Sequence, residues 1–87
     1  MKRENRTQRA ERITENLLTW YDGVDPYGAG MIIEDDHEAA FDYTLDCILN
    51  YPQNIIEELT GYIEETAEEP DKYSEAAADL IQQIKSL

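Results

Sequence analysis

The spacing of the apolar residues constrains the fold of this chain more than any other feature. They recur at i, i+3, i+4 and i+7 in four stretches, as in helices that bury one face. The residues expected to face inward are Ala10, Ile13, Leu17, Trp20, Tyr21 and Val24, then Phe41, Leu45, Ile48 and Leu49, then Ile55, Ile56, Leu59, Tyr62, Ile63 and Ala67, and finally Tyr73, Ala77, Leu80, Ile81, Ile84 and Leu87. Thr44 and Ala40 flank the second stripe and are left out of the predicted core. The pattern predicts an all-α fold, a small bundle of about four amphipathic helices.

Capping residues, glycines and prolines set the predicted boundaries of these helices. The predicted helices span residues 1–22, 35–50, 53–68 and 71–86, with an irregular Gly/Pro loop at 23–33. Asn5 or Thr7 is expected to cap the first helix, and Gly23 to end it. Asp35 or Asp36 is expected to cap the second, and Asp35 with Glu38 resembles a capping box. Pro52 suits the first turn of the third helix, and Pro70 separates the third helix from the fourth.

The length and composition predict one domain over residues 1–87. The chain has one cysteine, so no internal disulfide can form, and a lone thiol favours a reducing compartment. No apolar run approaches the length of a membrane span, and no hydrophobic segment follows the basic N-terminus as in a secretory signal. We therefore expect a soluble, cytoplasmic protein.

The charges are segregated along the chain, whose net charge is −13. The first twelve residues are basic, whereas residues 13–71 contain sixteen acids and no Lys or Arg, and residues 72–87 are balanced. Such an acidic body repels nucleic acid and anionic membranes and attracts basic proteins. The sequence therefore predicts a basic protein as the partner, with no direct contact to nucleic acid or membrane.

The acids of the second and third helices fall in rows. Asp35, Glu38, Asp42 and Asp46 step by three or four residues, and a step of four places carboxylates about 6 Å apart. This spacing is comparable to that of neighbouring phosphates in a nucleic acid backbone. The predicted partner-binding residues are Asp35, Asp36, Glu38, Asp42, Asp46, Glu57, Glu64, Glu65, Glu68, Tyr27 and Tyr43.

These rows favour a protein that mimics nucleic acid and inhibits a DNA- or RNA-handling enzyme. In size and charge the chain resembles phage-borne inhibitors of restriction or CRISPR nucleases, although no motif assigns it to a family. Two alternatives remain open. One is a helical adaptor or homodimeric subunit that binds through aromatic and apolar residues, with Tyr27, Tyr43 and Tyr51 expected to be exposed. The other is an immunity or antitoxin protein that neutralises a basic toxin.

The sequence offers little support for a metal, a cofactor or catalysis. Residues 25–36 have an Asp at the first and a Gly at the sixth position of a calcium loop. However, Tyr27 and Ala29 stand where side-chain oxygens are required, and Asp36 replaces the bidentate Glu at the last position. His37 is the only histidine, and we expect it on the surface at the start of a helix. Cys47 lies among acids, which disfavour a reactive thiolate. We expect a protein that is not an enzyme and holds no metal or cofactor.

Overall fold

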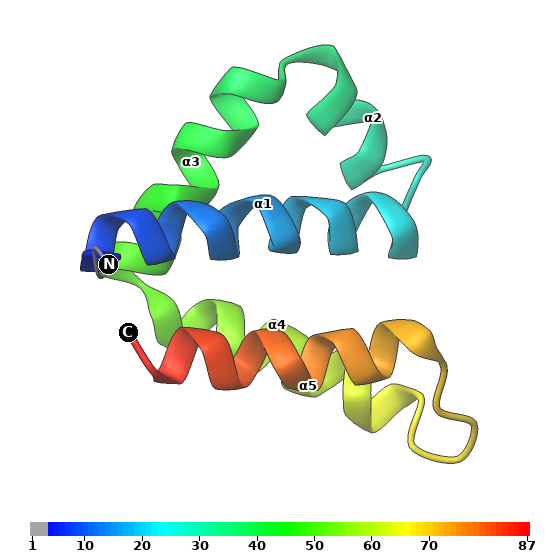
Figure 1. Cartoon of the computed structure of the whole chain (residues 1–87). Coiled ribbons are helices and arrows are strands. Elements are labelled where there is room, and N and C mark those ends of the chain that lie inside the picture. Colours follow the sequence, from blue (N-terminus) through cyan, green and yellow to red (C-terminus); the bar gives the residue numbers. More distant parts are fainter. Residues whose placement is uncertain (1–3) are drawn as a thin grey trace.

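The computed structural model describes residues 4–87 and confirms the all-α prediction (Figure 1). It contains five helices where the sequence predicted about four. They are α1 (Arg6–Val24), α2 (Ala29–Asp35), α3 (His37–Asn50), α4 (Pro52–Glu65) and α5 (Lys72–Lys85). None of the helices within the described range combines the length and hydrophobicity that a membrane crossing requires.

Most of the predicted boundaries agree with the structure, and the caps explain them. Asn5 caps α1 reciprocally, because its side chain accepts a bond from the Gln8 amide at 2.8 Å while its own amide donates to the Gln8 side chain. Residues 1–3 of the predicted first helix lie outside the described residues. Pro52 occupies the first turn of α4, as predicted. Helix α4 ends at Glu65, three residues before the predicted end, so Ala67 is exposed and not part of the core.

The predicted loop at 23–33 is wrong, because most of it is helical. Helix α1 continues through Gly23, and α2 begins at Ala29 after a tight turn. Asp25 closes this turn, since its carbonyl accepts from the Gly30 amide at 2.9 Å and its carboxylate accepts from the Ala29 amide at 3.2 Å. Gly30 is buried against α1, where a Cβ would lie 2.5 Å from Asp22 Oδ1. Of residues 25–36, which were compared with a calcium loop, Ala29–Asp35 form α2.

Of the two residues expected to cap the second predicted helix, Asp36 is confirmed, and the capping box between Asp35 and Glu38 is not formed. Asp35 is the last residue of α2, and Asp36 caps α3 by accepting a bond from the Ala39 amide at 3.1 Å. A single residue therefore separates the two helices, and their axes diverge from this junction in Figure 1.

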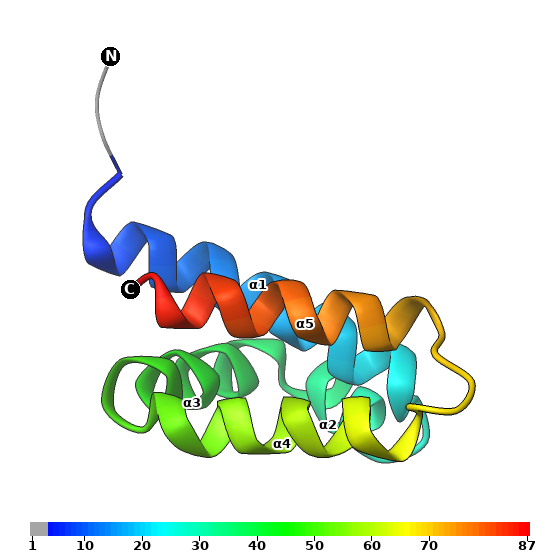
Figure 2. The ribbon, with the colours of Figure 1, turned by 90° about the horizontal axis from the view of Figure 1, so that it is seen from below.

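Helix α1 is the centre of the arrangement. It packs against α2, α3 and α5, while α4 packs against α3 and α5. In Figure 1, α2 and α3 lie on one side of α1, and α4 and α5 lie on the other. Figure 2 shows α1 and α5 running side by side.

The hydrophobic core lies mainly among α1, α4 and α5. The buried apolar residues are Ala10, Ile13, Leu17, Leu18, Trp20, Ile48, Ile55, Leu59, Ala77, Leu80, Ile81 and Ile84. Trp20 anchors α5 to α1, because its indole Nε1 donates to the Tyr73 carbonyl at 2.8 Å. The stripe predicted for α3 is only partly correct. Phe41, Leu45 and Leu49 are half-buried, whereas Thr44, left out of the predicted core, is buried.

Candidate functional site

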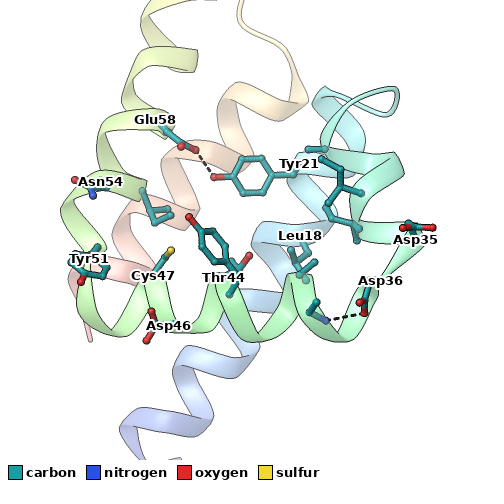
Figure 3. A pocket seen from close by; sticks show the side chains of 17 residues that line it. Leu18, Tyr21, Asp35, Asp36, Thr44, Asp46, Cys47, Tyr51, Asn54 and Glu58 are labelled. Atoms are coloured by element: carbon teal, nitrogen blue, oxygen red, sulfur yellow. Dashed lines mark hydrogen bonds between the residues drawn. The ribbon is translucent and has the colours of Figure 1, made fainter.

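An open groove of about 790 Å³ runs along α3 between α2 and α4 (Figure 3). Leu18 and Tyr21 of α1 contribute to its lining. Residues from both ends of α3 take part, from Asp36 at the N-cap to Tyr51 at the corner before α4. Its apolar lining residues are Leu18, Ala29, Ile32, Ile33, Ala39, Ala40, Cys47 and Ile55, together with the rings of Tyr21, Tyr43 and Tyr51.

Large apolar side chains on this groove face solvent. Ile32 is 70% exposed, Tyr43 73% and Tyr51 58%. The local sequence of α2 explains the first of these, because Met31, Ile32 and Ile33 are consecutive. In a helix, three consecutive side chains point in directions about 100° apart, so one neighbouring surface cannot bury all three. Helix α2 buries Gly30 against α1 and leaves Ile32 at the groove.

Four carboxylates line the groove beside this apolar surface: Asp35, Asp36, Asp46 and Glu58. In Figure 3, Asp35 and Asp36 lie together near one end of α3, Asp46 lies on the outer edge of that helix, and Glu58 projects from α4. None of the residues that line the groove is Lys, Arg or His. The groove is therefore apolar inside and negatively charged around its margin.

A tyrosine hydroxyl connects the apolar interior of the groove to its acidic margin. Tyr21 donates a hydrogen bond to the Glu58 carboxylate, which links α1 to α4 (Figure 3). Burial raises the pKa of the Tyr21 phenol, and the hydrogen bond and charge of Glu58 raise it further. The neighbouring Cys47 thiol also raises the pKa of Tyr43. An unperturbed phenol is already protonated at neutral pH, so the Tyr21 hydroxyl is available as the donor to Glu58.

Some of the predicted partner-binding residues line the groove, and the others lie outside it. Asp35, Asp36, Tyr43 and Asp46 line the groove. Glu38 and Asp42 are exposed on α3, and Glu57, Glu64 and Glu65 on α4, all outside the groove lining. Glu68 follows the end of α4 and so does not continue the predicted row on that helix. Tyr27 is 88% exposed in the turn before α2 and also lies outside the lining.

The sequence prediction of exposed Tyr27, Tyr43 and Tyr51 is confirmed, but several residues of the groove were missed. Ile32, Ile33 and Glu58 line it, although none was among the predicted binding residues. The run of three apolar residues at 31–33 was the available signal, since a short surface helix with that run must expose part of it. Glu58 carried no such signal, because its place depends on how α4 packs against α3 and α5.

His37, the single histidine of the sequence, lies outside the groove. His37 is exposed and stacks on Phe41, with 6.4 Å between the ring centroids. Over residues 4–87, no three His, Cys, Asp or Glu side chains gather in a way that could hold a metal ion. Comparison of the chain with family models, curated proteins and solved structures gives no match.

Proposed function

We propose that this chain is a protein-binding protein that takes an apolar segment of its partner into the groove beside α3. The observation that supports this most directly is the exposure of Ile32 and Tyr43 on a groove of about 790 Å³. Covering apolar side chains of this size on binding removes them from water, at about 25 cal/mol per Å² of buried surface. Exposed apolar patches beside polar residues are typical of interaction sites.

The test compares partners captured from a lysate by the unmodified protein and by two variants. Ile32→Asn removes the apolar side chain from the groove at a position that is 70% exposed, so the fold should tolerate it. Tyr27→Ser is the matched control, because Tyr27 is exposed but lies outside the groove lining. We expect a partner that Ile32→Asn loses and Tyr27→Ser keeps. Equal capture by both variants would contradict the groove as the binding site.

A second candidate is inhibition of a nucleic-acid-handling enzyme by mimicry. The observation that favours it is the row of exposed carboxylates Glu38, Asp42 and Asp46 along α3, stepping by about 6 Å in a body without Lys or Arg from residue 13 to 71. Such a protein would compete with nucleic acid for basic residues of the enzyme.

Charge reversal at Glu38 and Asp42 separates the two candidates. Both residues are outside the groove lining. Glu38→Lys with Asp42→Lys should therefore abolish binding by mimicry but leave binding of an apolar segment in the groove unchanged. A mimic should also be displaced by added DNA or RNA and weaken steeply with salt. Binding that survives both treatments but is lost in Ile32→Asn would exclude mimicry.

A further inference from the structure

We infer that the groove beside α3 accepts a basic amphipathic helix of a partner protein. This inference rests on the proposed function, because it names the occupant of the same groove. Two properties of the groove support it, namely its length and its charge. A third argument is that a second copy of the chain offers no suitable segment.

The length of the groove matches a helix of several turns. Lining residues extend along α3 from Asp36 to Tyr51, which is about 22 Å at the helical rise of 1.5 Å per residue. A partner helix of about four turns would cover this distance and place apolar side chains at i, i+3, i+4 and i+7 against Ile32, Tyr43 and Ile55. Strand addition is not available over residues 4–87, because no strand there offers an unpaired edge.

The negative charge around the groove favours a partner helix whose polar face carries basic residues. Asp35 and Asp36 lie near one end, Asp46 on the outer edge of α3 and Glu58 on α4, without a basic residue in the lining. Lys and Arg beside the apolar stripe of the partner would meet carboxylates along the groove. An acidic helix would meet like charges, which costs affinity and slows association.

A second copy of this chain is a poor occupant. Its net charge is −13, so two grooves facing each other would oppose the same carboxylates. The basic part of α1, with Arg6, Arg9 and Arg12, offers no free apolar stripe, because Ala10 and Ile13 are already buried in its own core.

The test measures binding of three labelled peptides of about 16 residues to the full chain by fluorescence anisotropy. All three carry the same leucines at i, i+3, i+4 and i+7, and the flanking positions are Lys and Arg, Gln, or Glu. We expect the basic peptide to bind about tenfold or more tightly than the Gln peptide at low salt, with the difference shrinking as salt is added. The Glu peptide should bind least.

Variants of the protein separate the contribution of apolar contacts to peptide binding from the contribution of charge. Ile32→Asn should weaken the basic and the Gln peptides alike, whereas Asp35→Asn with Asp46→Asn should reduce only the preference for the basic peptide. Glu64→Gln is the matched control, since Glu64 is exposed but does not line the groove. Circular dichroism of each variant confirms that the helices are retained.

The outcomes distinguish the inference from the proposed function. Equal affinity for the basic and Gln peptides, with both weakened by Ile32→Asn, would overturn the basic occupant and leave the groove as a docking site. Binding of the basic peptide that Ile32→Asn does not change would mean simple charge attraction and overturn both proposals. Failure of all three peptides to bind would overturn the helical occupant, and the lysate comparison with Ile32→Asn then decides whether the groove binds a partner of another shape.

Discussion

We call the side formed by α1, α4 and α5 the closed side, because most of its large apolar side chains are covered. The side formed by α2 and α3 is the open side, because large apolar side chains remain exposed there. Helix α5 buries four apolar residues in the core, while α2 buries only Gly30 and α3 only Ile48 and Thr44. Of the exposed large apolar side chains, Met31 and Ile32 belong to α2, and Tyr43 to α3. Helices whose apolar residues form one stripe close a core, and helices with apolar residues on further faces leave surface for a partner.

The largest effect is expected from a cavity on the closed side. Leu17 of α1 is fully buried, so Leu17→Ala removes packed atoms that the surroundings cannot replace. We expect the free energy of unfolding to fall by about 2–5 kcal/mol, measured by urea denaturation. A loss under about 1 kcal/mol would mean that this side is loosely packed, and the contrast with the open side would fail.

Two glycines within helices give the next largest effect, with opposite signs. A Cβ on Gly23 would lie 2.5 Å from Tyr73 Cε1 of α5, whereas a Cβ on Gly61 would meet no atom within 4 Å. Gly23→Ala should therefore destabilise the protein by about 1–3 kcal/mol through overpacking. Gly61→Ala should stabilise it by about 1 kcal/mol, because alanine favours the helix and nothing opposes it.

Thermal and urea unfolding of both variants provides the measurement, and each variant is the control for the other. Stabilisation by both substitutions would show that the Tyr73 ring moves aside and that the contact at Gly23 is not tightly packed. Gly61 accommodates neither a close helix neighbour nor an interruption of α4 in this structure, so its replacement by alanine should remove no contact.

A smaller effect is expected at acidic pH, at the start of α5. The Asp71 carboxylate accepts a bond from the Ser74 amide at 2.8 Å and another from the Tyr62 hydroxyl at 2.9 Å. These bonds hold the pKa of Asp71 below its ordinary value, the Ser74 amide contributing most. Because the folded-state pKa is lowered, the stabilisation is complete above the ordinary carboxyl pKa and is lost as the pH falls through the lowered value.

Urea midpoints measured over a series of acidic pH values test this expectation. The difference in stability between the unmodified protein and Asp71→Asn should shrink as the pH decreases. Glu69→Gln, an exposed change in the same connection between α4 and α5, should show the acid dependence of the unmodified protein. A constant difference at every pH would mean that the cap does not depend on the charge of Asp71.

The smallest effect on stability is expected on the open side. Ile32 is 70% exposed, so Ile32→Ser should change the free energy of unfolding by no more than about 0.5 kcal/mol. The same urea measurement that detects Leu17→Ala applies here. A loss of more than about 1 kcal/mol would show that Ile32 stabilises the fold, and the groove would then be part of the core.

Much of the closed side could be predicted from the sequence because its determinants are local. The apolar residues of α5 recur at helical spacing, and Ala77, Leu80, Ile81 and Ile84 are all buried, as predicted. Pro52 and Pro70 cannot continue a helix, and they lie where α4 begins and within the connection between α4 and α5. Asn5 caps α1 through contacts with a residue only three positions away.

The open side was decided by contacts between helices and by packing that no local pattern specifies. A seven-residue helix is too short to be stable alone, so α2 depends on the contact of Gly30 with α1 and on the turn that Asp25 closes. These contacts are not visible in the sequence, where Gly28 and Gly30 are typical of a loop. The acidic character of the body was determined by the sequence alone, whereas the grouping of Asp35, Asp46 and Glu58 along one groove follows from the way α2 and α4 flank α3.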